Sequence, residues 1–289
     1  MTAIYKRELK SYFTSPIGYV VLALQVAVTA LYFTSYCLFN GYPYAAYPLY
    51  GTSIILLFTV PFLTMRSMSE DRKTKTDQLL LTAPVSTTSV VLGKYLAMIT
   101  IYGIADLIYC IYPIAIRLFG DYYATGADYL AILTHFLLAC VYIGIGLLIS
   151  SLCENQIIAV IGTFAALFVL YMWSGILNLL PTTAFSSLVM IFVLLLAAAV
   201  VLYYLSRTTL IPGIVAIGGA IIAAVFYLVD DSSFESLVPN ALSAFNLSEP
   251  FSSIASNQLL DIPGLLLYFS LIFLTLFLTV QGVQRRRWN

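Results

Sequence analysis

Long apolar stretches separated by short polar ones run along the whole chain. Each of eight stretches has roughly the 20 mostly apolar residues that a helix needs to cross a hydrocarbon core. These stretches are residues 17–39, 47–65, 95–119, 129–150, 156–176, 185–205, 209–229 and 264–283. Lipid offers no water to backbone groups, and the runs are too long and too uniformly apolar for barrel strands, so we expect helices. The pattern predicts an all-α integral membrane protein, with about eight transmembrane helices bundled into a single domain over residues 1–289.

The distribution of Lys and Arg predicts the orientation of this bundle. An even number of spans puts both termini on one side, and every Lys and Arg except Arg117 falls on that side. Because cytoplasmic loops carry an excess of Lys and Arg, we expect both termini in the cytoplasm. A composition of 61% hydrophobic and 9% charged residues excludes a soluble fold.

Two of the segments outside the spans are amphipathic. Residues 1–16 place apolar and basic side chains on opposite faces at helical spacing, which predicts a helix lying in the headgroup plane. Residues 230–263, on the external side, mix acids and serines with apolar side chains and predict short amphipathic pieces in the outer interface. These pieces would either cover an apolar cargo or anchor the protein in the bilayer.

The long cytoplasmic segment, residues 66–94, has the clearest local signals. Thr74 with Asp77 fits a capping box, leucines follow at 79–81, and Pro84 stops the helix. The segment therefore predicts a short helix across the membrane face, followed by a second helix that starts at residue 86 and enters the third span. The leucines would either dock on a partner or fold back onto the bundle or the lipid.

Residues that could carry chemistry are scarce. His135 is the only histidine, so there is no H-E-x-x-H zinc site, and the four cysteines form no C-x-x-C motif. Gly93-Lys94 resembles the end of a P-loop, but Thr88 and Tyr95 stand where that motif requires Gly and Ser or Thr. We therefore expect no enzymatic activity, no metal and no cofactor bound by this chain, and an energy source in the membrane or in another protein.

Two polar residues lie deep within predicted spans. Asp106 is the one acid in the middle of a span, and Gln25 lies midway along the first span. Because an ionisable group in lipid is costly, Asp106 should face the bundle interior, where it could line a transport path or a dimer seam. The alternative is a neutral carboxyl group bonded to a tyrosine or a backbone carbonyl. Gln25 has the same two interpretations.

Small residues within the spans indicate close helix packing. Gly144 and Gly146 lie in the fourth span, where the absence of a side chain lets a neighbouring backbone approach. We expect both glycines to face other helices. His135, near the outer end of the same span, is expected to hydrogen-bond to a neighbouring helix or to interfacial water.

Four blocks along the chain carry a resemblance to a known family. The first is residues 5–19, and the most specific is Lys75-Thr-Asp-Gln-Leu-Leu-Leu-Thr-Ala-Pro-Val-Ser86 followed by Val91-Leu-Gly-Lys94. The other two are Ser150-Ser-Leu-Cys-Glu-Asn-Gln156 and a C-terminal block made of residues 277–280 and 285–288. In these blocks the chain resembles permease subunits of type-2 ABC exporters, particularly the branch that includes gliding-motility permeases.

The resemblance implies a division of labour between chains. Such permeases carry no ATPase of their own and bind a separate ABC ATPase subunit, which holds ATP and Mg. The resemblance implies a coupling helix formed by Thr76, Asp77, Gln78, Leu79, Leu80 and Leu81, with Glu154 and Asn155 as a secondary contact. It implies that the N-terminal helix, with Lys6, Arg7 and Glu8, is the connecting helix against the same partner.

The resemblance also implies the assembly and the location. It implies pairing with a second permease copy or a paralogue, in the plasma membrane of a bacterium, with no role for nucleic acid. Compact relatives have six spans, so the pair over residues 185–229 would be additional.

The predicted function is export of a hydrophobic or amphipathic cargo, driven by ATP hydrolysed on the partner ATPase. The alternative is a secondary carrier or channel that is not coupled to an ATPase. A carrier needs coupling groups near the midplane, where Asp106 stands nearly alone.

Overall fold

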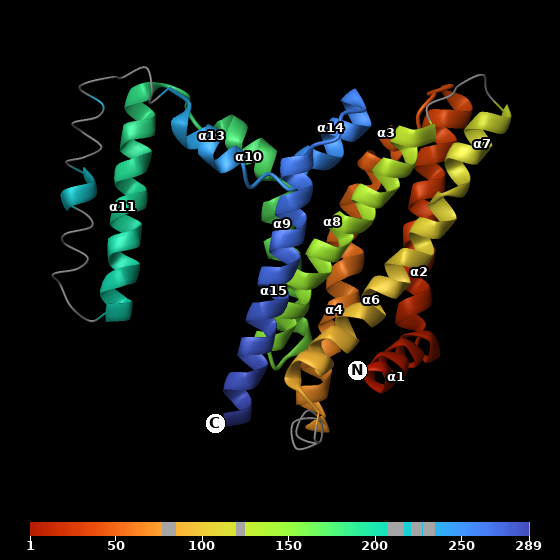
Figure 1. The fold of residues 1–289 in the computed structure, drawn as a ribbon, viewed down its shortest axis with the longest axis horizontal. Coiled ribbons are helices and arrows are strands. Elements are labelled where there is room, and N and C mark those ends of the chain that lie inside the picture. The colour runs from red at the N-terminus through yellow and green to blue at the C-terminus, as the bar shows by residue number, and fades with distance from the viewer. Residues whose placement is uncertain (77–84, 120–124, 207–216, 221–226, 228–234, 289) are drawn as a thin grey trace. The chain divides into compact units, whose positions relative to one another are not determined.

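The computed structural model describes the chain except for residues 77–84, 120–124, 207–216, 221–226, 228–234 and 289. Over the described residues, the secondary structure is helical and contains no strand. The chain forms two compact units (Figure 1). Unit 1 consists of Met1–Tyr171 and Leu247–Asn289, and unit 2 consists of Met172–Asn246.

Unit 1 contains the long helices that the apolar pattern predicts, together with short helices at both ends. Its elements are α1 (Thr2–Thr14), α2 (Pro16–Phe33), the π-helix η1 (Thr34–Phe39), α3 (Ala46–Gly51), the 3-10 helix η2 (Thr52–Ile55), α4 (Leu56–Lys73), α6 (Thr87–Tyr109), α7 (Ile111–Phe119), α8 (Thr125–Leu152), α9 (Gln156–Tyr171), α14 (Glu249–Asn257) and α15 (Ile262–Trp288).

Unit 2 contains α10 (Trp173–Leu179), α11 (Ala184–Ser206) and α13 (Leu237–Ser243). The indole Nε1 of Trp173 donates a hydrogen bond to the Leu242 carbonyl at 2.9 Å, which joins α10 to α13. The backbone N–H of Ser236 donates to the Thr182 carbonyl at 3.0 Å. These bonds hold together two segments that are far apart in the sequence.

Five described helical segments are long and apolar enough to cross a membrane. They are Pro16–Phe39, Ala46–Lys73, Thr87–Leu118, Gly126–Leu152 and Ile262–Arg285. A sixth span is possible if α9 and α10, which are separated by a break at Met172, are counted together. The predicted span 209–229 lies mostly outside the described residues.

The core of unit 1 forms around α8, which contacts α3, α4, α6, α9, α14 and α15. Side chains of α4 and α8 at this centre are fully buried: Leu56, Val60, Leu63, Ala139, Val141, Ile143 and Leu147. Large apolar side chains on the outer faces of the helices are exposed instead, among them Leu31, Leu107, Ile157 and Phe273. Such a distribution suits a bundle that is surrounded by lipid.

Close packing of α8 relies on the two predicted glycines. A Cβ on Gly146 would lie 2.6 Å from the Oγ1 of Thr64 on α4, and one on Gly144 would lie 2.5 Å from the Oγ1 of Thr275 on α15. Both distances are too short for a real contact. The expectation that these glycines face other helices is confirmed.

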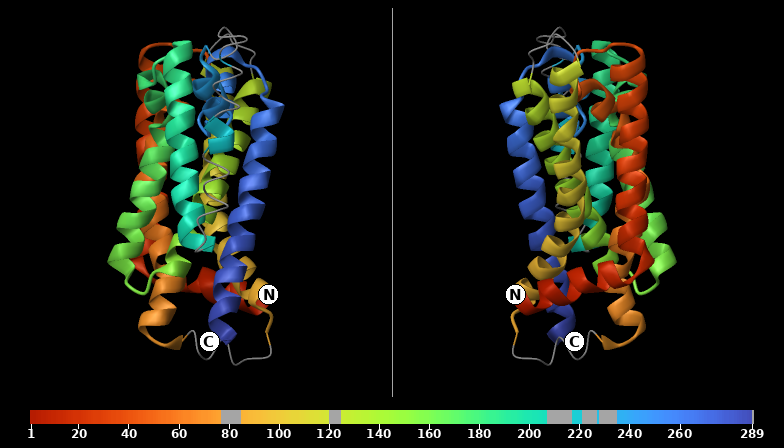
Figure 2. Two further views of the ribbon diagram at one scale, coloured as in Figure 1. Left: turned by 90° about the vertical axis from the view of Figure 1, so that its left-hand side faces the viewer. Right: turned by 90° about the vertical axis from the view of Figure 1, so that its right-hand side faces the viewer.

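The two ends of unit 1 differ in charge and in structure. One end carries α1, the end of α4, the start of α6, the α8–α9 turn and the C-terminus of α15, and we call it the basic end (Figure 1). Most described Lys and Arg residues lie in these segments, and Arg117, in the last turn of α7, lies at the opposite end. The N-terminal helix α1 lies crosswise to α2 at the basic end (Figure 2).

The opposite end is covered by α14, one of two described helices within residues 230–263. The amphipathic pattern of this segment predicts pieces in the outer interface that act as an anchor or cover a cargo. In α14, Phe251 and Ile254 are completely buried, and the helix contacts α3 and α8. Its apolar face therefore packs on the bundle and not on lipid, because the ends of α3 and α8 provide a matching apolar surface.

Candidate functional site at the basic end

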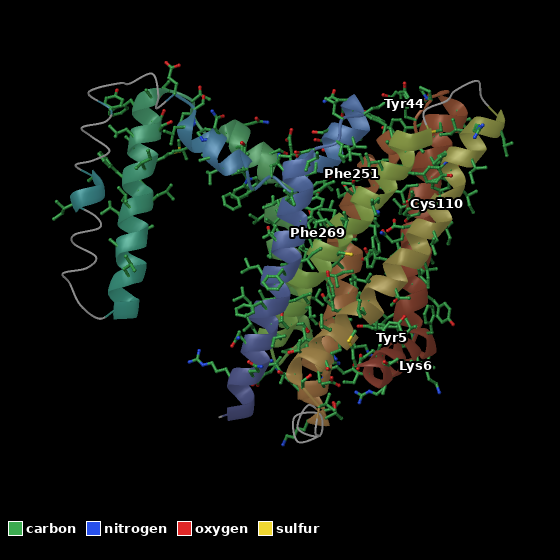
Figure 3. All side chains as sticks on the ribbon, viewed as in Figure 1. Tyr5, Lys6, Tyr44, Cys110, Phe251 and Phe269 are labelled. Atoms are coloured by element: carbon green, nitrogen blue, oxygen red, sulfur yellow. The ribbon has the colours of Figure 1, made fainter. Side chains whose placement is uncertain are left out.

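The N-terminal helix α1, predicted as the connecting helix, is fixed to the bundle by two tyrosines. The Tyr5 hydroxyl lies 3.0 Å from the Thr100 hydroxyl on α6, and the Tyr12 hydroxyl donates to the Leu63 carbonyl on α4 at 3.2 Å. Burial raises the pKa of Tyr12, so its phenol stays protonated and remains a donor. Lys6 points away from the bundle on the same helix (Figure 3).

Helix α1 also lies close to the start of α6. A Cβ on Gly93 would lie 3.0 Å from the Cγ2 of Ile4, so only a residue without a side chain allows this approach without displacement. The bundle-facing side of α1 buries Glu8 and Tyr12, whereas Lys6 and Arg7 are exposed. Of the three predicted residues, only Glu8 is therefore buried against the bundle.

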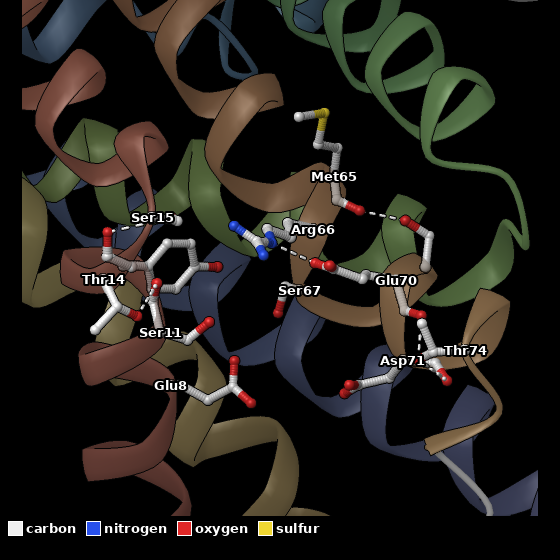
Figure 4. Close-up of polar contacts among 12 residues, drawn as sticks. Glu8, Ser11, Thr14, Ser15, Met65, Arg66, Ser67, Glu70, Asp71 and Thr74 are labelled. Carbon is white, nitrogen blue, oxygen red and sulfur yellow. Dashed lines mark hydrogen bonds and ion pairs between the residues drawn. The ribbon is translucent and has the colours of Figure 1, made fainter.

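A buried lysine joins α1 and α4 to α6. The Nζ of Lys94 lies 3.1 Å from Glu8 Oε1 on α1 and 2.6 Å from Asp71 Oδ2 on α4. It also donates to the Ser67 carbonyl on α4. Glu8 and Asp71 extend from α1 and α4 toward the same space (Figure 4). The lysine side chain is 2% exposed and makes two hydrogen bonds, to Glu8 and to the Ser67 carbonyl, in addition to its ion pair with Asp71.

The exposed side chain of Arg7 completes the charge balance of this cluster. Two carboxylates around one ammonium leave one negative charge, and the half-exposed Arg7 lies 3.6 Å from Glu8 and 3.8 Å from Asp71. Formal charge in the group Arg7, Glu8, Asp71 and Lys94 therefore sums to zero. Buried charges persist in a protein when they are paired and hydrogen-bonded in this way.

The predicted coupling segment begins at this cluster. Thr76 donates through its hydroxyl to Asp71 Oδ1 at 3.0 Å, and Asp71 is the carboxylate that pairs with Lys94 through its other oxygen. The remaining predicted residues, Asp77, Gln78, Leu79, Leu80 and Leu81, lie outside the described residues.

The predicted capping box is wrong for Thr74. Its hydroxyl and its backbone N–H both bond back to the Glu70 carbonyl at 2.9 Å, so Thr74 ends α4 and does not start a new helix. Lys75 then adopts a positive φ of 58°. The reason is that α4 stays helical beyond its apolar stretch, through Lys73. The second expectation holds: Ser86 caps α6 by accepting from the Ser89 N–H at 3.3 Å.

The α8–α9 turn, which carries Glu154 and Asn155, lies against the end of α4. Arg72 Nη1 donates to the Cys153 carbonyl at 3.1 Å, which brings the turn next to α4. Glu154 and Asn155 are exposed. Asn155 also starts α9, because its side-chain oxygen accepts from the Ile157 N–H at 2.9 Å.

Asp106 pairs with the only histidine of the chain. The Oδ1 of Asp106 on α6 lies 2.9 Å from Nδ1 of His135 on α8, and both side chains are buried. The expected tyrosine or carbonyl partner of Asp106 is wrong, because α6 and α8 pack with these two side chains facing each other. The expectation that His135 bonds to a neighbouring helix is confirmed.

Gln25 is the second polar residue that the sequence singled out. It is 1% exposed on α2, and neither atom of its amide has a hydrogen-bond partner in the described part of the chain. One turn further on, Thr29 donates to the Tyr109 hydroxyl of α6 at 3.1 Å. Gln25 and Asp106 therefore lie inside unit 1, as expected of polar residues within spans.

The structure brings together Glu8, Arg7 and Thr76 from the predicted site and adds Lys94 and Asp71, which sequence reasoning missed. A signal for Lys94 was present, since it follows Val90, Val91 and Leu92 in an otherwise apolar helix. A lysine in such a position needs an acidic partner from another helix.

Comparison with known proteins identifies the family. The family model described as ABC-2 family transporter protein matches residues 3–188, a stretch that runs from α1 into α11. No curated protein matches the chain. Because the family match covers well over half of the chain, the protein belongs to the ABC-2 transporter family and is a multi-pass membrane permease of an ABC transporter.

Proposed function

We propose that this chain is the permease subunit of an ABC exporter that moves a hydrophobic or amphipathic cargo out of the cell. ATP and Mg are bound and used by a separate ATPase subunit, and a second permease copy or a paralogue completes the path. The complex resides in a bacterial plasma membrane with the basic end in the cytoplasm. The branch that includes gliding-motility permeases is the part of the family to which we assign it.

The observation that supports this proposal is the connection at the basic end. Thr76, the first residue of the proposed coupling helix, bonds to Asp71, which pairs with Lys94, which in turn binds Glu8. A partner that pressed on the coupling helix would therefore act on α1, α4 and α6 together. The α8–α9 turn with Glu154 and Asn155 adjoins α4 and offers the secondary contact.

The sequence contains no P-loop or other nucleotide-binding motif, which is consistent with ATP hydrolysis on a separate subunit. Cargo polarity is proposed from the scarcity of polar groups inside the bundle. A groove of about 470 Å³ lies between α6 and α8, lined mostly by apolar residues such as Leu107 and Phe136, with Thr100, Asp106 and Tyr129 also in its wall. A hydrophobic cargo would meet a mostly apolar surface there.

A secondary carrier is the second candidate, and the Asp106–His135 pair favours it. Paired ionisable side chains within a bundle are typical of proton relays in carriers. The two candidates differ in their energy source. Export that continues with ATP after the proton gradient is collapsed supports the exporter, and export that stops supports the carrier.

The leucines of the proposed coupling helix provide the direct test. We expect the triple change Leu79→Ser, Leu80→Ser and Leu81→Ser to leave the protein inserted but to abolish association with its ABC ATPase. The reason is that three adjacent leucines in a cytoplasmic helix would form an apolar surface, which docking would remove from water. Co-purification of the ATPase with tagged permease, followed by ATP hydrolysis in proteoliposomes, measures this.

The matched control changes exposed leucines at the opposite end, Leu259→Ser and Leu260→Ser, which should leave ATPase association unchanged. Equal recovery of the ATPase with the 79–81 variant and with wild type would refute the coupling assignment. ATP hydrolysis by the isolated permease would refute the division of labour.

A further inference from the structure

We propose that Lys94 is the positioning residue that fastens the connecting helix α1 and the end of α4 to α6, so that movement of the coupling helix is transmitted along α6. The inference rests on the proposed function, because it assigns the residue through which an ATPase would act. It concerns Lys94, which lies outside the segments that dock on the partner.

The geometry at Lys94 is that of a three-helix junction. The ammonium group comes from α6, one acceptor comes from α1 and two come from α4. The ammonium group hydrogen-bonds to Glu8 and to the Ser67 carbonyl and forms an ion pair with Asp71. Because the side chain is almost fully buried, the group has no water to replace a lost partner. Separating any of these helices from α6 would leave a charge buried without its counter-charge, which is strongly unfavourable.

Other contacts between these helices are weaker or more local. Tyr5 and Tyr12 each make one neutral hydrogen bond, to α6 and to α4 respectively. Arg7 is more than half exposed, and its ion pairs with Glu8 and Asp71 are long, at 3.6 and 3.8 Å. Among the described residues, Lys94 is the charged side chain that binds both α1 and α4 from α6.

Helix α6 extends the effect of this junction into the bundle. Asp106 follows Lys94 by twelve residues, a distance of about 18 Å along a continuous α-helix. There it meets His135 on α8. A displacement of α6 at Lys94 therefore changes the packing of α6 on α8 at this pair, which is the kind of helix shift by which packed bundles switch states.

Three variants distinguish a role of Lys94 in transmitting movement to α6 from a role in the stability of the fold alone. Lys94→Met removes the buried charge and leaves two carboxylates with only Arg7 to offset them. The triple variant E8Q/D71N/K94M removes the three largely buried charges, keeps only Arg7, whose side chain is more than half exposed, and leaves amides that can bond to each other and to the Ser67 carbonyl. Replacing a complete buried ion network with neutral groups is often tolerated, so the triple variant is expected to fold. Arg66→Met is the matched control, because it removes an ion pair within α4 alone.

The first measurement uses the permease alone. We expect the α1 amides to exchange hydrogen about tenfold faster in Lys94→Met than in wild type, because α1 loses its charged attachment. Arg66→Met should leave α1 exchange unchanged. Unchanged exchange of α1 in Lys94→Met would overturn the inference, whatever the partner does.

The second measurement follows the helices in the complex with the ATPase. Spin labels at Ala3→Cys on α1 and Thr88→Cys on α6 are placed on a background without Cys37, Cys110, Cys140 and Cys153. The α1–α6 distance should be the same without nucleotide and after trapping with ATP and vanadate. In the triple variant it should differ between the two states, while ATPase binding persists and transport-coupled turnover is lost.

The two failures are distinguishable. A triple variant that keeps a constant α1–α6 distance and wild-type coupling would overturn the role of Lys94 and leave the proposed function intact. A wild-type permease that binds no ABC ATPase would overturn the proposed function, while the exchange measurement on the isolated protein still decides whether Lys94 holds α1.

Discussion

A charged or ionisable side chain within an apolar helix needs a counter-group on another helix. Lys94 and Asp106 lie on the same helix, α6, and each meets this need across a helix interface. Lys94 is compensated by two acids and a carbonyl. Asp106 has a single histidine, and its second oxygen has no partner in the described part of the chain. The two sites therefore differ in how the ionisable side chain of α6 is paired: Lys94 has two acidic partners, whereas Asp106 has one histidine.

Substitutions at Asp106 test the second site. Asp106→Ala leaves His135 buried without its hydrogen-bond partner, and we expect a loss of about 1–3 kcal/mol in the free energy of unfolding. Asp106→Asn keeps an amide that can bond to Nδ1 of His135, so its loss should be smaller. Thermal unfolding of the purified protein in detergent measures both.

Equal destabilisation by the two Asp106 variants would show that the hydrogen bond to His135 contributes little. The Asp106→Asn variant also tests the path. If it unfolds like wild type but lowers turnover of the reconstituted transporter, the acid takes part in transport, and unchanged turnover assigns it to packing.

At the scale of helices, α8 is positioned by the close approach of its neighbours. Its glycines at 144 and 146 face α15 and α4, whereas Gly126, in the first turn, has no atom near the position of a Cβ. Glycine is therefore required for close packing at 144 and 146 but not at 126. In a membrane, where apolar burial does not drive helix association, such close contacts supply much of the packing energy.

A methyl group at these positions gives a clear prediction. Gly146→Ala would place its Cβ against Thr64, and we expect a loss of about 1–3 kcal/mol from overpacking. Gly126→Ala should have little effect, because open space surrounds it. Thermal unfolding of the two variants compares them directly, and similar midpoints for both would contradict the role of Gly146.

Helix α1 shows how an amphipathic pattern is used. Its sequence is compatible with a helix lying on lipid, yet its buried residues include the acid Glu8. An acid on the buried side makes sense against Lys94 and not against acyl chains. The element is therefore part of the bundle's basic end and not only a surface anchor.

At the scale of the molecule, unit 1 has one end rich in Lys and Arg and an opposite end covered by α14. Both ends of the described chain in unit 1, at α1 and α15, lie at the basic end (Figure 1). The positive-inside rule supports our proposal that this end faces the cytoplasm. An ATPase could reach the coupling helix only with that orientation.

Cysteine labelling in intact cells tests the orientation. On a background without native cysteines, Asn40→Cys, exposed between η1 and α3, should react with a membrane-impermeant maleimide. Thr88→Cys, exposed at the start of α6, should react only after the cells are permeabilised. The reverse pattern would contradict the assigned orientation and with it the proposed site of ATPase docking.

Local properties of the sequence account for much of the fold. The positions of α2, α4, α6, α8 and α15 follow from stretches of apolar residues, because the cost of placing backbone in lipid depends on length and polarity within one segment. The helix start at Ser86 was likewise readable from its own residues. The end of α4 was not, because a helix that leaves the membrane can continue without an apolar signal.

The sequence by itself determined that this is a helical membrane protein with its positive charge on one side, since hydropathy and charge are properties of segments. Only the tertiary structure decided the partners of Lys94 and Asp106. Glu8 is 86 residues from Lys94, and His135 is 29 residues from Asp106. Such pairs depend on which helix faces meet, and that choice is made by packing over the whole bundle.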